Sequence, residues 1–336
     1  MKPLDDRGTS ETSPHSGGEP RPQSRLLIPL SVAAVALGVV ALVLWIPRLR
    51  QNHSHSHSEP AAVAPLPPGA TKVDEMLFQA RVAKSNNKAD EAMALANKAI
   101  AAEPNNPRTY YLRGALFESA KQHEQAIADY NEVIRLEPKA SQAYQNRGSE
   151  HFMLGKFTES VADFDSFLEL KPDQKAQHWQ RGIACYYAGR FAEGREQFEL
   201  HQTVNTNDVE NAVWHFLCVA RLEGVEQARA ALISIKDDHR VPMMRVHDLF
   251  ASKATPADVL AATKKDNPPA DELGHRQFYA DLYLGLYFEA TGDASRTREY
   301  IFKAVERAAD NGFMGAVAQV HAELLRRGET KKAAQP

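Results

Sequence analysis

The chain has 336 residues, of which 43% are apolar and 25% charged, proportions typical of a globular protein. Its formal net charge of −3 excludes the strongly basic surface of nucleic-acid-binding domains, so no nucleic-acid partner is expected. The two cysteines, Cys185 and Cys218, are expected as buried free thiols, with a disulfide as the alternative, because free cysteine is among the most buried residue types.

The N-terminal part of the chain is predicted to carry a membrane anchor. Residues 1–25 are polar and lack apolar periodicity, so we expect a disordered tail. Residues 26–46 carry no charge and, at about 1.5 Å per residue, are long enough to cross the ~30 Å hydrocarbon core. A signal peptide is the alternative, but Pro47-Arg48-Leu49-Arg50 follows instead of a small-residue cleavage site. We therefore predict one retained transmembrane helix, through which the protein contacts the membrane.

The charges beside this span do not decide its orientation. Arg21 and Arg25 precede it, and Arg48 and Arg50 follow it. The positive-inside rule therefore favours neither orientation, because each flank carries two arginines.

Residues 47–72 are predicted to be a His- and Pro-rich linker between the membrane and the folded part. His53, His55 and His57 alternate with serines, and weak capture of a divalent metal is one interpretation of this run. We favour a polar spacer, because a metal site needs fixed geometry and supporting contacts around its ligands. Neither a metal nor another cofactor is predicted.

Residues 73–208 are predicted to form four helix hairpins of one repeated kind. Two blocks superpose at a spacing of 34 residues, so that Tyr110, Arg113, Gly114, Phe117, Ala126, Tyr130 and Pro138 lie opposite Tyr144, Arg147, Gly148, His151, Ser160, Phe164 and Pro172. Gly114, Gly148 and Gly182 recur at the same spacing. A helical glycine costs about 1 kcal/mol relative to alanine, so this recurrence indicates close packing between helices.

This register resembles the tetratricopeptide repeat (TPR). The resemblance implies an all-α fold, an α-superhelix of stacked hairpins whose concave wall binds proteins or peptides. The first hairpin, from Val73, carries smaller side chains at the pattern positions. The fourth has Gly194 and Thr206 where alanine and proline are usual.

The C-terminal third is predicted to be helical but less regular. Residues 209–277 show no clean repeat, although Thr255-Pro256-Ala257-Asp258 predicts a helix start with Thr255 as N-cap. Residues 278–327 are expected to form a TPR-like hairpin, turning at Thr291-Gly292-Asp293, and a helix that covers the end of the stack. Residues 328–336 are expected to be a frayed tail.

The concave wall supplies the candidate partner-binding residues. Placing the TPR phase on the repeats predicts that eleven side chains face it: Arg108, Tyr111, Gln142, Gln145, Ser149, Phe152, Met153, Trp179, Ile183, Tyr186 and Tyr187. Aromatic and amide side chains suit an extended or helical peptide. The alternative is that Trp179, Tyr186 and Tyr187 are covered by the chain's own C-terminal helices.

The arginines that precede the repeat glycines have two interpretations. Arg113, Arg147 and Arg181 recur with the repeat and suggest either an anion-binding track or buried stems with outward heads, and we favour the second. The nearby pair Asp163 and Asp165 is expected to be solvated.

No motif points to catalysis. The sequence lacks a zinc-protease His-Glu-x-x-His, a Gly-x-Ser-x-Gly elbow, a phosphate-binding loop and a dinucleotide fingerprint. A protein that is not an enzyme is therefore expected. An unrecognised catalytic site within residues 209–271 is the alternative from another functional class.

The order of segments also resembles the NlpI-type envelope lipoproteins. The matching stretches include Asn146-Arg147-Gly148, residues 181–190 from Arg181 to Arg190, and Phe278-Tyr279 through Leu284-Gly285. This resemblance implies a scaffold on the periplasmic side of the bacterial membrane that gathers peptidoglycan hydrolases and processing proteases. Unlike those lipoproteins, the chain has no N-terminal cysteine to carry lipid, so the span at 26–46 would replace the lipid anchor. A cytoplasm-facing adaptor is the alternative, and homo-oligomerisation is left open.

Overall fold

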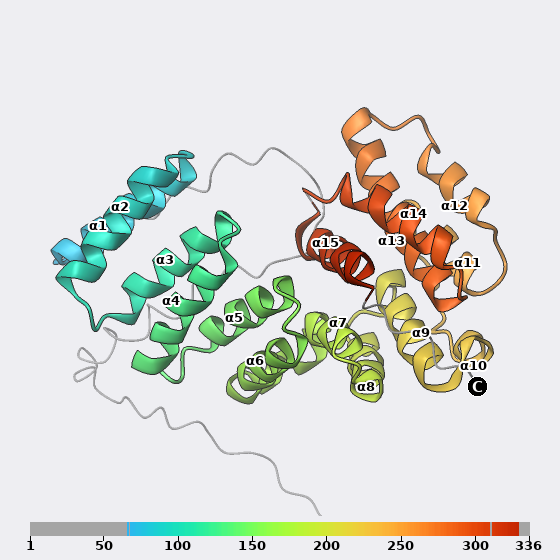
Figure 1. Ribbon diagram of the computed structural model, residues 1–336, viewed down its shortest axis with the longest axis horizontal. Coiled ribbons are helices and arrows are strands. Elements are labelled where there is room, and N and C mark those ends of the chain that lie inside the picture. Colours follow the sequence, from blue (N-terminus) through green and yellow to red (C-terminus); the bar gives the residue numbers. More distant parts are fainter. Residues whose placement is uncertain (1–65, 67, 310, 329–336) are drawn as a thin grey trace, which may run out of the picture. The chain divides into compact units, whose positions relative to one another are not determined.

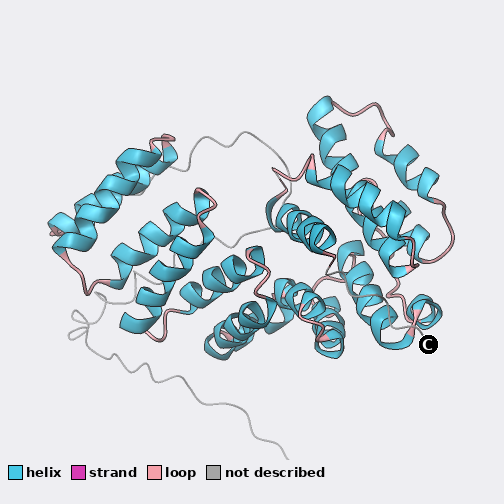
Figure 2. Ribbon diagram, viewed as in Figure 1, coloured by secondary structure: helices cyan, strands magenta, loops and turns pink. Residues whose placement is uncertain are grey.

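The computed structural model describes residues 66, 68–309 and 311–328, which form an all-α array of helix hairpins (Figures 1 and 2). These residues belong to one compact unit, Glu59–Pro336. The predicted tail at 1–25, the span at 26–46 and the histidine run lie outside the described residues. Within the described part, no helix is both long and apolar enough to cross a membrane.

The first four hairpins follow the predicted repeats. They consist of α1 (Lys72–Ser85) with α2 (Ala89–Ala102), α3 (Pro107–Ser119) with α4 (His123–Leu136), α5 (Ser141–Met153) with α6 (Phe157–Leu170), and α7 (Trp179–Tyr187) with α8 (Phe191–Gln202). A short 3₁₀ helix, η1 (Pro172–Gln177), precedes α7.

The repeat glycines let an aromatic ring of the second helix pack against the backbone of the first. A Cβ atom built on Gly114, Gly148 and Gly182 would lie 3.0, 2.8 and 2.7 Å from ring atoms of Tyr130, Phe164 and Phe198, respectively. These rings are fully buried or nearly so. The prediction of close packing is therefore confirmed, and the close neighbour is a ring of the paired helix.

The repeat arginines hold neighbouring hairpins together. Arg113 donates to both Asp129 oxygens at 2.8 and 2.7 Å and, on its other side, to Asn97 Oδ1 at 2.9 Å. Asp129 belongs to the same hairpin, and Asn97 to the preceding one. We call this arrangement the arginine bridge. The guanidinium group of Arg113 is neutralised by the Asp129 carboxylate of the same hairpin. The favoured interpretation, in which the arginine heads point outward, was therefore wrong, and the arginines do not form an anion-binding track.

The second bridge corrects the expectation for Asp163. Arg147 donates to Asp163 at 2.9 and 2.5 Å and to Asn131 at 2.7 Å, and the Asp163 side chain keeps only 6% of its surface exposed. Burial alone would raise the pKa of Asp163, but hydrogen bonds from His151 and Arg147 hold that pKa below its ordinary value. In the third bridge, Arg181 reaches Asp165 at 2.5 Å.

The irregular segment contains one central helix and three short ones. α9 (Val209–Glu223) packs against α8, α10 (Val225–Ala230), α11 (Met243–Phe250) and α13, and most of its residues are buried. Cys218 on α9 and Cys185 on α7 are buried free thiols, as predicted. α12 (Pro256–Thr263) begins at the predicted cap, where the Thr255 hydroxyl accepts from the Asp258 amide.

The last hairpin consists of α13 (Ala270–Ala290) and α14 (Ala294–Val305), and α15 (Gly312–Arg327) follows it. α13 begins at Ala270, before the expected start at 278, and the predicted turn at residues 291–293 separates it from α14. The helix expected to cover the end of the stack instead packs against α14 and the repeat helix α5 (Figure 1).

Candidate partner-binding surface

The inner wall, formed by the eleven predicted side chains on α3, α5 and α7, divides into two halves. The open half contains Arg108 and Gln142, which are exposed, and Tyr111, Gln145 and Ser149, which are half-buried. The covered half contains Phe152, Ile183 and Tyr186, which are buried, and Met153, Trp179 and Tyr187, which are half-buried.

A hydrogen-bond network fixes the side chains beneath the open half. Asn146 donates to the hydroxyls of Tyr111 at 3.3 Å and Tyr130 at 3.0 Å, and the Tyr130 hydroxyl donates to Glu118 at 2.8 Å. Burial raises the pKa of Glu118 and of both tyrosines. The tyrosine hydroxyls therefore stay protonated at neutral pH. Asn146 was absent from the predicted set, although it lies on the same helix face as Gln142.

Cationic side chains lie along the N-terminal part of this half. Arg108 pairs with Asp74 at 2.7 Å but keeps 56% of its side chain exposed. Lys84 donates to the carbonyl of Ala115 at 3.1 Å. Arg81 is exposed and forms no ion pair with any acid in the described part of the chain. Arg81 and Lys84 were missed because the first repeat matches the pattern weakly.

The amides of α5 bond mainly to one another and to the start of the next hairpin. Gln142 donates to Asn146 at 2.8 Å, and Gln145 donates to Gln180 at 2.8 Å. The side-chain oxygen Oε1 of Gln145 also lies 2.5 Å from Nε2 of His178. These bonds hold the amides in one orientation along the wall.

Helix α15 covers the other half of the inner wall. The Phe313 ring lies 5.0 Å from the ring of Phe152 and 5.4 Å from that of Trp179, measured between centroids. This contact occupies part of the wall that was predicted to face a partner's peptide. The prediction that Phe152, Ile183 and Tyr186 contact a partner is corrected, because all three are buried in this structure.

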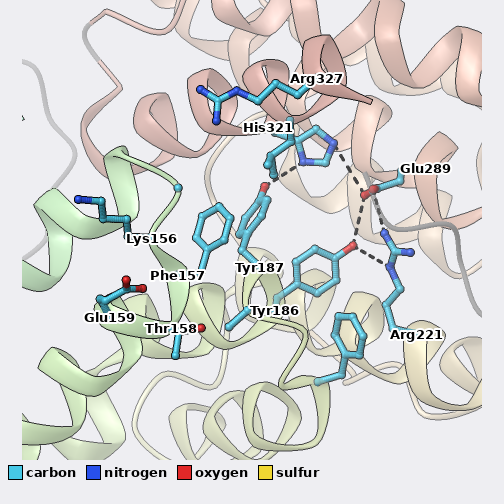
Figure 3. Close-up of a pocket in the computed structure, with 14 residues that line it drawn as sticks. Lys156, Phe157, Thr158, Glu159, Tyr186, Tyr187, Arg221, Glu289, His321 and Arg327 are labelled. Atoms are coloured by element: carbon cyan, nitrogen blue, oxygen red, sulfur yellow. Dashed lines mark hydrogen bonds and ion pairs between the residues drawn. The ribbon is translucent and has the colours of Figure 1, made fainter. Parts of the chain in front are cut away.

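A polar network joins α7 to α13 and α15 (Figure 3). The Tyr186 hydroxyl accepts from Arg221 Nε and donates to Glu289, at 3.2 Å each, and Arg221 pairs directly with Glu289 at 2.9 Å. The Tyr187 hydroxyl lies 2.9 Å from Nδ1 of His321. Of the two alternatives for Tyr186 and Tyr187, the structure shows the one in which C-terminal helices cover them.

The two tyrosines and the histidine of this network are uncharged, beside the Arg221–Glu289 ion pair. Burial, with Glu289 close by, raises the pKa of Tyr186 and Tyr187, so both hydroxyls remain protonated. Burial lowers the pKa of His321, which is uncharged at neutral pH.

The segment proposed as an alternative catalytic site contains a partly buried ion cluster around Arg240. This guanidinium contacts Asp208 at 2.6 Å, Glu210 at 2.5 Å and Asp238 at 2.6 Å. The contacts fasten the loop before α11 to the start of α9. Among the described residues, no group of three or more His, Cys, Asp or Glu side chains is arranged to hold a metal ion.

Comparison with known proteins identifies the repeats. Residues 107–140 and 141–174 each match a tetratricopeptide repeat model. These two hairpins are therefore consecutive TPRs, as the resemblance of their 34-residue register implied. No curated protein matches the chain.

Solved structures of TPR proteins resemble it at low identity. A tetratricopeptide repeat protein from Parabacteroides merdae is 17% identical and covers 76% of this chain and 98% of its own, with a TM-score of 0.49. PilF from Pseudomonas aeruginosa is 13% identical and covers 75% and 97%, with a TM-score of 0.41. MamA from Desulfovibrio magneticus is 14% identical and covers 48% and 91%, with a TM-score of 0.44.

Proposed function

We propose that the protein is a membrane-anchored TPR scaffold that binds partner proteins, such as envelope hydrolases or proteases, through the open half of its inner wall. TPR arrays use their concave faces as binding surfaces. The anchor is the apolar span at 26–46, and the resemblance to NlpI-type lipoproteins supports placing the repeats on the periplasmic side.

One observation supports this assignment most directly. Helix α15 occupies the wall at Phe152 and Trp179, whereas Arg108 and Gln142 remain exposed. The wall therefore has a part that the chain fills itself and a part that is free for another molecule.

The open half favours an extended peptide with acidic residues. Arg81 and Arg108 are exposed, and Arg108 also pairs with Asp74. Guanidinium groups bind carboxylates with two parallel hydrogen bonds. Tyr111 offers a ring that is held in place by Asn146, and the Gln142 amide can bond to a peptide backbone. The partner contact we propose combines charge attraction along α1 and α3 with amide bonds along α5.

A charge reversal tests the binding surface. We expect Arg108→Glu with Gln142→Ala to weaken partner binding about tenfold or more, since the first change replaces attraction by repulsion. The matched control is Arg135→Glu on α4, where the side chain is 58% exposed, close to the 56% of Arg108. Partners should co-purify with wild type and the control but not with the double variant. Equal recovery with all three proteins would refute the surface.

A separate measurement tests the location. Protease added to intact spheroplasts should cleave the repeats before lysis, as in a lysed control. Protection until lysis would place the repeats in the cytoplasm and remove the proposed envelope partners, while leaving the binding surface to be judged by the charge reversal.

A further inference from the structure

A pocket of about 480 Å³ lies where the repeats meet the C-terminal helices, apart from the open half of the wall. Its walls come from the first turn of α6, the last turn of α7, and α9, α13 and α15 (Figure 3). The volume falls within the range of about 300–1,000 Å³ found for ligand sites. The Tyr186–Arg221–Glu289 network forms one wall of the pocket.

One side of the pocket is aromatic. Phe157, Tyr187 and Phe191 line it, and the ring centroids of Phe157 and Tyr187 lie 5.3 Å apart in a stacked arrangement. Stacked, half-buried rings offer an apolar surface at little cost in side-chain entropy.

The mouth of the pocket favours negative charge. Lys156 is the N-cap of α6, and its side chain does not cap the helix. The amides of Phe157 and Thr158 make no hydrogen bond to any described residue, so the positive end of the helix is open. Arg327 lines the same mouth from α15, where it also pairs with Glu323 at 2.8 Å, and Glu159 is the exposed acid there.

Comparison between repeats shows that Lys156 differs from its counterpart. Lys88 is the N-cap of α2, two repeats earlier, and it pairs with Glu91 at 3.1 Å. Lys156 and Glu159 have the same spacing but form no ion pair. The lysine charge at the pocket is thus left without an acid partner among the described residues.

A second, independent feature of the pocket is an unpaired atom in its wall. His321 lines the pocket and is 1% exposed, and its Nε2 has no hydrogen-bond partner in the described structure. The nearest acid oxygen, on Glu289, lies 3.9 Å away, too far for a direct bond. A buried polar atom without a partner is costly, and a bound polar group would relieve that cost.

We propose that this pocket is a second binding site that takes an acidic side chain and a neighbouring large apolar side chain from a partner's peptide. The carboxylate lies at the α6 N-terminus between Lys156 and Arg327, and the apolar side chain lies against Phe157 and Tyr187. This inference rests on the proposed scaffold function and adds a recognition element outside the open half of the wall.

The test is selection from a displayed library of random twelve-residue peptides on the full chain. Thr158→Trp is the blocking variant, because Thr158 is an exposed residue at the mouth and the indole would fill the pocket without removing a buried contact. We expect the selected peptides that lose binding to this variant to carry Asp or Glu beside Phe, Leu, Ile or Trp. Failure to obtain peptides that distinguish the two proteins, or enrichment of basic peptides, would overturn the site.

Charge variants then locate the carboxylate. For a selected peptide, fluorescence anisotropy should show about tenfold weaker binding to Lys156→Glu and unchanged binding to Lys88→Glu, the matched N-cap control. Equal effects of the two changes would overturn the assignment. If native partners are lost with Arg108→Glu and Gln142→Ala but retained with Thr158→Trp, the proposed function stands and this second site does not.

Discussion

Substituting Gly148 by alanine tests the packing of the repeats most sharply. The added methyl group would lie 2.8 and 2.9 Å from two ring carbons of Phe164 and 3.2 Å from Cβ of Asp163. The Phe164 ring is 0% exposed, so it has no free space into which to move. Overpacking of this kind costs about 1–3 kcal/mol, and the better helix propensity of alanine returns about 1 kcal/mol. We expect a net loss of about 0–2 kcal/mol in the free energy of unfolding.

The control is Gly274→Ala in α13. No atom lies within 4 Å of a Cβ built there, so alanine should stabilise the helix by about 0.5–1 kcal/mol. Urea unfolding followed by circular dichroism gives the denaturation midpoint of each variant. The two midpoints can be compared when the denaturant slopes are similar. If Gly148→Ala proves as stable as Gly274→Ala, the explanation of the repeat glycines is refuted.

Three further predictions concern buried contacts. Replacing Arg147 by Met should cost about 3 kcal/mol, because Asp163 stays buried with its main cation removed, and a loss below about 1 kcal/mol in urea unfolding would contradict this. Replacing Phe313 by Ala should cost about 2–3 kcal/mol. It should also raise acrylamide quenching of tryptophan fluorescence, since Trp179 loses its cover, and unchanged quenching would argue against that contact. Burial raises the pKa of Asp281 from 3.8 to about 6, so the fold binds this proton more tightly than the unfolded chain does. Its contribution to stability is present below pH 3.8 and is lost as the pH rises through about 6. The Asp281→Asn variant should lack that slope, and parallel pH profiles would rule the assignment out.

The repeat architecture could be predicted because its signals are local and recur. Gly114, Gly148 and Gly182 fix the phase of the hairpins at one spacing, and the cap at Thr255 is a short-range hydrogen-bond pattern. The arginine bridge was also within reach, since Arg113 precedes Asp129, and Arg147 precedes Asp163, by the same 16 residues.

The coverage of the inner wall could not be predicted in the same way. The sequence showed that α15 has an apolar face, but periodicity does not reveal which surface such a face meets. The contact between Phe152 and Phe313 depends on the path of α9 through α14, where the repeat phase is lost. For that reason Trp179 and Tyr187 were equally compatible with an open and a covered wall.

The arginine bridge tolerates deletion of one repeat but not deletion of the next. Deleting residues 107–140 would put Arg147 at the former distance of Arg113 from Asn97, with Asp163 still in its own hairpin. The shortened array would keep every partner of that bridge. Deleting 141–174 instead would remove Asp163 and Asp165 together and leave Arg181 with Glu193 as its acid. Loss of the module before Arg147 therefore keeps the acid partner of its bridge, whereas loss of the module after it removes Asp165 from Arg181.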